Sequence, residues 1–311
     1  MIKRTLYFGN PVYLSLKDRQ LVVKLPEVEK NDALSASLKA YAAKTVPVED
    51  IGVVLLDHQQ ITVTHALLDA LTENNCAVIT CNGSHLPTGL LLPLEGNSLQ
   101  QERYADQIQA SLPLKKQLWQ QTVMAKIRNQ ARVLEYVLKE EPRSMKLWAE
   151  KVKSGDSDNL EARAAAYYWS RLFPDIPDFV RDREGEYPNN LLNYGYAILR
   201  AIIARALVAS GLLPTLGIHH HNRYNAYCLA DDVMEPYRPY VDKLVVATIG
   251  KYPSETELSG MVKKELLTIP VLDVAMEGLR RPLMVAASQT AASLYKCYSG
   301  ELRKVVYPIM E

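Results

Sequence analysis

The sequence has little cysteine: four Cys residues occur among 311. Cys76 and Cys81 are the one close pair, and no second pair is present to complete a zinc site of the usual spacing. Packed side chains are therefore the favoured interpretation. So few cysteines also fit a reducing compartment.

Long hydrophobic runs are lacking as well. The longest apolar stretch, residues 197–208, is interrupted by Arg200 and Arg205, whereas a bilayer span needs about 20 apolar residues. The N-terminal "MIKRTLYFGNPVYLSL" has no continuous apolar core before a small-residue cleavage site, so we do not expect a signal peptide. These features predict a cytoplasmic protein without a membrane partner.

An excess of charge is the third absence. Lys and Arg number 36 against 35 Asp and Glu, which gives a net charge of +1. This balance neither requires nor excludes nucleic acid, because a local basic face can coexist with a neutral total. The 48% hydrophobic and 23% charged content is that of an ordinary globular protein.

The pattern along the chain predicts two domains. Residues 1–95 carry short runs with β-branched and aromatic residues, and the continuous apolar run 51–57 is typical of a strand buried on both faces. From residue 96 the periodicity becomes helical, and Ser98 with Gln101 resembles a capping box at the boundary. We expect an α+β protein: a small β-rich domain, 1–95, followed by a larger all-α domain, 96–311.

One predicted helix, from about residue 189 to residue 210, is apolar on most sides and should lie in the middle of the helical domain. Gly195 lies inside it. Glycine costs a helix about 1 kcal/mol relative to alanine, so we expect a close backbone approach at this position.

The segment "GIHHHNRYNAYCLADDVMEPYR", residues 217–238, is the first candidate metal site. Asp232 and Glu235 are spaced i, i+3, which places both on one face if a helix begins there. Pro236 should end or redirect that helix. The preceding histidines could converge on the carboxylates across a polar loop. A solvated histidine loop before an acidic helix start is the alternative.

Glu161 is the other candidate. It lies in "GDSDNLEARAAAYYW", where Asp158 as N-cap and Glu161 three residues later form a capping-box-like pair. The small alanines that follow leave room for a bulky group to approach. On spacing alone, the capping role is favoured over a functional one.

Four motifs in order resemble the CRISPR-associated integrases, the family that inserts new spacers into CRISPR arrays. They are "EARAAAYYW" (161–169), "LLNYGYAILRA" (191–201), "GLLPTLGIHH" (211–220) and "LADDVMEPYRPYVD" (229–242). The last of these and "AKIRNQA" (125–131) are most similar to the type II branch. The resemblance spans essentially the whole chain.

The resemblance implies a metal site formed by Glu161, His220 and Glu235. His220 is preferred over His219 and His221 for its spacing to Gly217 and Glu235, and Asp232 is either a ligand or a residue behind the ligands. It also implies Mg²⁺ or Mn²⁺, with a histidine ligand favouring Mn²⁺. The reaction is a transesterification in which a 3′-hydroxyl of double-stranded DNA attacks the CRISPR repeat. No ATP is needed, and no Walker-type glycine loop is present.

The implied partners are DNA and protein. We expect phosphate contacts among a set of polar residues along the helical domain: Arg163, Asn193, Tyr194, Arg223, Arg238, Arg280 and Arg281. The family further implies a homodimer joined through the β-rich domains, the small CRISPR adaptation partner protein, and other type II CRISPR proteins.

Two rival functions follow from the same residues. A helical di-metal oxidase would need two Glu-x-x-His pairs, and neither Glu161 nor Glu235 has a histidine three residues later. A catalytically inactive DNA-binding scaffold would have lost ligands, and here all three expected ligands are present.

Overall fold

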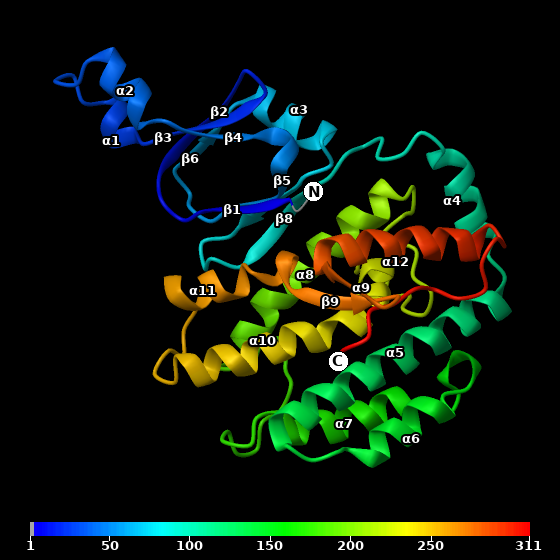
Figure 1. Ribbon diagram of the computed structural model, residues 1–311. Coiled ribbons are helices and arrows are strands. Elements are labelled where there is room, and N and C mark those ends of the chain that lie inside the picture. The colour runs from blue at the N-terminus through cyan, green and yellow to red at the C-terminus, as the bar shows by residue number, and fades with distance from the viewer. Residues whose placement is uncertain (1–2) are drawn as a thin grey trace. The chain divides into compact units, whose positions relative to one another are not determined.

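The computed structural model describes residues 3–311, and the chain divides into two compact units, Met1–Gly96 and Asn97–Glu311. Figure 1 shows the strands concentrated in the first unit and the long helices in the second. The expected β-rich region followed by a helical region is thus observed.

The N-terminal unit holds two four-stranded sheets, in the orders β1-β5-β7-β8 and β4-β3-β2-β6. Their bounds and those of the helices in this unit are β1 Arg4–Phe8, β2 Val12–Lys17, β3 Gln20–Lys24, α1 Pro26–Glu29, α2 Ala36–Ala42, β4 Lys44–Pro47, η1 Val48–Asp50, β5 Ile51–Leu56, β6 Ile61–Val63, α3 His65–Glu73, β7 Ala77–Cys81 and β8 Pro87–Leu91.

Strand β5 is buried along nearly its whole length, as its continuous apolar run predicts, because β1 and β7 flank it on both sides in parallel register. Leu14, Leu21 and Leu67 form one core with the first residue of β5, Ile51. Cys76 is buried in that core, as expected of a packed thiol.

The second unit is mainly helical. Its elements are α4 Gln100–Gln109, α5 Leu112–Leu138, α6 Arg143–Lys151, η2 Ser154–Asp156, α7 Leu160–Leu172, α8 Asn189–Ala209, α9 Cys228–Met234, η3 Glu235–Tyr237, α10 Arg238–Lys251, α11 Gly260–Leu266, η4 Ile269–Val271, β9 Asp273–Met276, β10 Leu279–Pro282 and α12 Leu283–Tyr298. In Figure 1, α6 and α7 lie along α5, and α12 packs across α8.

Helix α8 lies in the core of this unit, as predicted. It is long and apolar enough to cross a membrane by length and composition, yet 83% of its most apolar window is buried inside the protein. Gly195 explains part of this packing, because a Cβ there would lie 2.5 Å from the Val241 side chain of α10. The close approach expected at Gly195 is confirmed.

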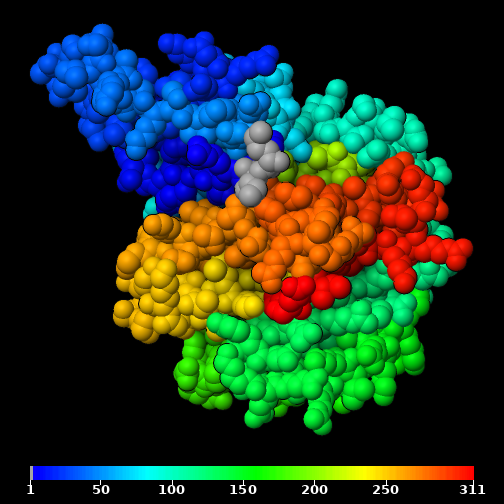
Figure 2. Space-filling view, in the orientation of Figure 1, coloured from blue at the N-terminus to red at the C-terminus, as the bar shows by residue number. Residues whose placement is uncertain are grey.

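The last residues of the chain pack against α5. Asn129 donates to the carbonyls of Pro236 (2.7 Å) and Pro308 (3.0 Å), and its own carbonyl accepts the Met310 N–H (2.9 Å). Figure 2 shows the C-terminal segment, in red, exposed on one face beside the green helices. One buried side chain therefore ties the C-terminal tail to the turn that follows Glu235.

Two local predictions differ from the structure. The region after residue 96 is not purely helical, because β9 and β10 form a hairpin whose turn, Glu277 and Gly278, has positive φ. The capping box of Ser98 and Gln101 is wrong: Leu99 is the N-cap of α4 and makes no side-chain capping bond. Asn97 organises this entry instead, by accepting the Leu99 N–H at 3.0 Å.

Candidate metal centre

Three helical segments of the second unit place Glu161, Glu235 and Lys126 together. The Lys126 Nζ lies 2.7 Å from Glu161 Oε1 and 2.6 Å from Glu235 Oε2. The two carboxylate oxygens are therefore no farther apart than the sum of these distances. Residues from α5, α7 and η3, which are distant in sequence, thus surround a single cation position.

The Glu161 side chain can approach Lys126 because Asp156, and not Glu161, caps the start of α7. The carboxylate of Asp156 accepts the N–H groups of Leu160 and Glu161, each at 2.9 Å. Asp158 is exposed and pairs with Lys153 instead, at 2.8 Å. The predicted cap by Asp158 is therefore wrong. The Glu161 side chain, 22% exposed, points to Lys126 and not back to its own backbone.

Glu235 lies where the chain passes from α9 into the 3-10 turn η3. Pro236 follows it, so α9 ends just before the proline, as expected, and α10 begins two residues later. The Glu235 side chain is 6% exposed, and its second oxygen, Oε1, lies 3.0 Å from the Arg238 Nε.

His220 is held by Asp232 and not by Glu235. The fully buried Asp232 carboxylate contacts the His220 Nδ1 through Oδ1 and accepts the His219 N–H at 2.8 Å. The Nε2 atom of His220 is thereby left as the ring nitrogen for a metal, since an acidic partner on Nδ1 fixes the other nitrogen as the ligand in many metal sites. Gly217 permits the tight loop: a Cβ there would lie 2.3 Å from the His220 carbonyl oxygen.

The other two histidines are placed differently. His219 stacks on Trp119 of α5, with ring centroids 4.3 Å apart and planes at 4°. His221 is exposed. Of the three, His220 is the one whose ring contacts a buried carboxylate.

The charges around the site shift its pKa values. Burial would raise the pKa of Glu235, but Arg238 and Lys126 outweigh it and hold that pKa below its usual value. The hydrogen bond to Asp232 raises the pKa of the His220 imidazole above its ordinary value, while burial lowers that of His219. Glu235 is therefore anionic at neutral pH and His220 is the more basic histidine.

The residues fit a divalent cation in part. Among residues 3–311, no three His, Cys, Asp or Glu side chains are already arranged as a metal cluster. However, the buried Oε2 of Glu235 makes no well-oriented hydrogen bond, although it lies next to the Lys126 ammonium. Glu235 Oε2 and the Glu161 carboxylate lie on either side of the Lys126 ammonium. Two carboxylates placed in this way are suitable ligands for an ion that prefers oxygen, such as Mg²⁺ or Mn²⁺.

Arg223 and Arg163 are both exposed. Arg223 shares a depression of about 390 Å³ with Lys115 and His220. Arg163 is exposed two residues after Glu161, with its guanidinium 4.7 Å from the centre of the Trp148 ring. Both remain predicted phosphate contacts.

The other predicted DNA contacts on α8 and α10 are buried or already bonded to other residues of the protein. Tyr194 is fully buried, a position without access to DNA. Asn193 accepts from Arg181 at 2.6 Å and donates to the Arg183 carbonyl at 2.7 Å, so it fastens the loop before α8. Arg238 is partly buried and is committed to Glu235.

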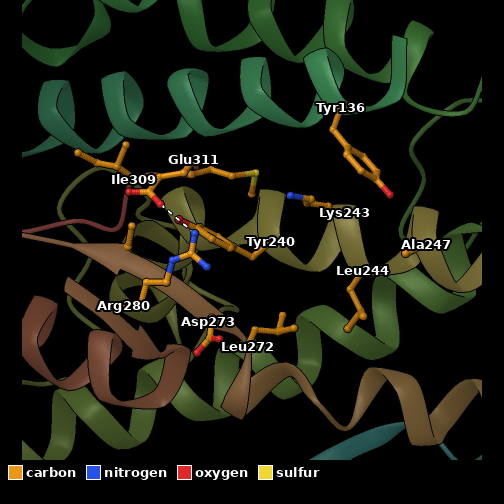
Figure 3. A pocket seen from close by; sticks show the side chains of 12 residues that line it. Tyr136, Tyr240, Lys243, Leu244, Ala247, Leu272, Asp273, Arg280, Ile309 and Glu311 are labelled. Carbon is orange, nitrogen blue, oxygen red and sulfur yellow. Dashed lines mark hydrogen bonds and ion pairs between the residues drawn. The ribbon is translucent and has the colours of Figure 1, made fainter. Parts of the chain in front are cut away.

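Arg280 and Arg281 lie on the hairpin strand β10. Arg280 borders a pocket of about 340 Å³ and lies 3.3 Å from the Glu311 carboxylate, as Figure 3 shows. Tyr240 and Lys243 of α10 line the same pocket. Because its lining includes none of Glu161, His220 and Glu235, this pocket is separate from the candidate centre.

Lys126 was not singled out by the sequence analysis, although it lies in the quoted "AKIRNQA" stretch. The available signal was its position: it follows Val123 by three residues and precedes Gln130 by four, on the buried stripe of α5. A lysine at a core position requires an anionic partner. That requirement points to a nearby carboxylate pair.

Comparison with known proteins places the chain in a family. The model of the family CRISPR associated protein Cas1 matches residues 6–257. A CRISPR-associated endonuclease Cas1 from Neisseria meningitidis is 34% identical over 294 residues, which cover 94% of this chain and 91% of the relative.

Two solved structures have the same fold at low identity. A casposase bound to integration product superposes with a TM-score of 0.76 and 18% identity, covering 98% of this chain and 92% of that one. A CAS1 protein from Thermotoga maritima gives a TM-score of 0.73 and 16% identity, covering 99% of this chain and all of the other.

The order of a β-rich unit followed by a helical one is thus shared, in sequence and in fold, with a class of CRISPR-associated proteins. The chain belongs to the Cas1 family. The family predicted from the four motifs is confirmed, and the type II-like branch is consistent with the Neisseria relative.

Proposed function

We propose that this chain is a metal-dependent integrase and endonuclease of CRISPR adaptation. It joins the 3′-hydroxyl ends of double-stranded DNA fragments to the CRISPR repeat. The observation that carries this proposal is the pair of carboxylates, Glu161 and Glu235, that share one cation position at the Lys126 ammonium. His220, which pairs with Asp232, is the third proposed ligand. The names of the Neisseria relative and of the casposase structure support the reaction class.

The ligands would be Glu161, Glu235 and the Nε2 of His220, with Asp232 orienting the histidine. A bound Mg²⁺ or Mn²⁺ would polarise the phosphoryl oxygens, lower the pKa of the attacking hydroxyl and stabilise the leaving oxygen. The attacking 3′-oxygen forms a bond to phosphorus as the repeat's own 3′-oxygen leaves and takes up a proton. One phosphodiester replaces another, so no nucleotide hydrolysis is required.

The protein would hold DNA mainly by its backbone, because incoming fragments vary in sequence. Three exposed or half-buried cations could make these contacts. Arg223 and Lys115 line the depression that includes His220, and Arg163 follows Glu161 by two residues. Binding should weaken steeply with salt and depend little on the fragment's sequence.

The assembly belongs to the same proposal. We expect a homodimer formed through the N-terminal unit, working in the cytoplasm with the small CRISPR adaptation partner protein and with other type II CRISPR proteins. The N-terminal unit is the expected dimerisation domain, and residues 97–311 are the expected catalytic domain.

Strand transfer tests the activity. The full chain with its small partner protein is incubated with 3′-hydroxyl fragments and a supercoiled repeat plasmid in Mn²⁺, Mg²⁺ or EDTA. Joined products should require metal and disappear in Glu161→Gln and Glu235→Gln. Glu150→Gln, an exposed carboxylate on the neighbouring helix α6, is the matched control and should keep wild-type activity.

Metal-dependent DNA binding without joined products would favour the inactive scaffold. Products that persist in EDTA would overturn the proposed metal chemistry. Oxygen consumption on metal loading would instead indicate the di-metal oxidase.

A further inference from the structure

The Lys126 side chain occupies the position that a metal ion would need. Its ammonium is within 2.7 Å of one oxygen of Glu161 and within 2.6 Å of one oxygen of Glu235. We propose that Lys126 holds the place of the metal between these carboxylates while no metal is bound, and that metal binding displaces it. This inference rests on the proposed function.

Electrostatics requires a cation at this point in the metal-free protein. Glu235 is 6% exposed and Glu161 is 22% exposed, so two negative charges lie close together with little water around them. Bringing such a pair together without a counterion would be strongly unfavourable. The Lys126 side chain, 11% exposed, supplies that counterion from the middle of α5.

The same oxygens cannot serve the ammonium and a divalent ion at once. A bound Mg²⁺ or Mn²⁺ lies about 2.0–2.2 Å from its carboxylate oxygens, which would leave it against Nζ with like charges in contact. One of the two cations must leave. Lysine can withdraw without unfolding its helix, because its charge is carried on a flexible four-carbon stem.

The two contacts of Lys126 are unequal, which indicates where displacement begins. The Glu161 contact is a hydrogen bond, whereas the Glu235 Oε2 makes no well-oriented one. The other oxygen of Glu235 lies 3.0 Å from the Arg238 Nε, so the carboxylate keeps one cationic neighbour when Lys126 moves. We expect a metal to take Oε2 of Glu235 first, and Lys126 then withdraws from Glu161 as the metal binds both carboxylates.

The proposal predicts that removing the charge strengthens metal binding. In Lys126→Met the stem is kept and the ammonium is lost, so Mn²⁺ no longer competes for the carboxylates. Titration of the full chain with Mn²⁺, followed by electron paramagnetic resonance of the free ion, should show a dissociation constant lower by about tenfold, which corresponds to about 1.4 kcal/mol. A residue that merely stabilises the fold would not lower it.

A second readout needs no activity. In EDTA, Lys126→Met should melt at a lower temperature than the wild type, and saturating Mn²⁺ should raise its melting temperature by more than it raises that of the wild type. Lys126→Arg keeps the charge and should retain Mn²⁺ affinity close to that of the wild type. Lys243→Met is the matched control, because Lys243 of α10 packs over the Tyr136 ring and not against the carboxylates.

Equal or weaker Mn²⁺ binding by Lys126→Met would overturn the proposal. If that variant does not fold without metal, it is prepared with Mn²⁺ present. Unfolding on chelation, under conditions in which the wild type stays folded, would support the placeholder role, whereas failure to fold even in excess Mn²⁺ would overturn it. A wild-type chain that binds no Mn²⁺ would instead overturn the proposed function, and this inference with it.

Discussion

Replacing Asp232 with asparagine tests how the histidine is prepared for a metal. The substitution keeps the shape of the side chain and removes its charge. In the structure, Asp232 Oδ2 accepts the His219 N–H at 2.8 Å and Oδ1 contacts His220 Nδ1. If the asparagine carbonyl keeps the first contact, its NH₂ group faces His220 Nδ1. That nitrogen must then accept, so the imidazole proton moves to Nε2, the atom needed for the metal.

The expected cost follows from this change of tautomer. Loss of such an orienting carboxylate lowers metal affinity by about tenfold to a hundredfold, which corresponds to about 1.4–2.8 kcal/mol. Weakening the charge-assisted hydrogen bonds to the histidine loop should also lower the free energy of unfolding by about 1–3 kcal/mol. Strand transfer by Asp232→Asn should therefore need more Mn²⁺ and recover in part at saturating Mn²⁺.

Asp231→Asn provides the control within the same helix. Asp231 is also buried, but its carboxylate pairs with Arg200 at 2.7 and 3.0 Å. Its replacement should reduce stability and leave the Mn²⁺ requirement unchanged. If Asp232→Asn and Asp231→Asn show the same Mn²⁺ dependence, the assignment of His220 and the orienting role of Asp232 are both refuted.

Three further predictions concern the same centre. Gly217→Ala should displace the histidine loop, because the new Cβ would lie 2.9 Å from Asp232 Oδ2 as well as against the His220 carbonyl; Mn²⁺ affinity should fall, and wild-type affinity would contradict this. Asp156→Ala should destabilise the protein by about 1–2 kcal/mol in urea unfolding, whereas Asp158→Ala should change it by less than about 0.5 kcal/mol; equal effects would contradict the capping by Asp156. The folded-state pKa of His220 is raised by its pairing with Asp232. This pairing therefore stabilises the fold in full at a pH below the unfolded pKa of about 6.5, and the stabilisation is lost as the pH rises through the folded-state pKa. Metal binding needs the neutral imidazole, so Mn²⁺ affinity should increase over that same rise, and His220→Gln should abolish the step in a pH series of Mn²⁺ titrations.

Elements with a strong local pattern could be predicted from the sequence. The buried strand at 51–57, the core helix with its close approach at Gly195 and the end of α9 before Pro236 all follow from hydrophobic runs and backbone chemistry. The i, i+3 spacing of Asp232 and Glu235 was also informative. The structure separates their contacts, however, since Asp232 faces His220 and Glu235 faces Lys126.

The remaining features depend on contacts that sequence spacing does not encode. Asp156 caps α7 in place of Asp158. Gly155, Asp156 and Asn159 all have positive φ, and this backbone conformation places the Asp156 carboxylate at the first N–H groups of α7. The Lys126 ammonium reaches Glu161 and Glu235 only because α5 packs against α7 and η3 in the folded protein. The β9–β10 hairpin is too short, at four residues a strand, to show clear alternation.

Asn129 connects the C-terminal tail to the turn that follows Glu235. Its amide nitrogen holds the Pro236 and Pro308 carbonyls together. A fusion that pulls on the final residues would load the segment next to Glu235, although no tail side chain touches Glu161 or Glu235 in the described ion pairs. Affinity tags, fluorophores or tethered partner domains attached to the last few residues should therefore be judged by metal affinity as well as by yield.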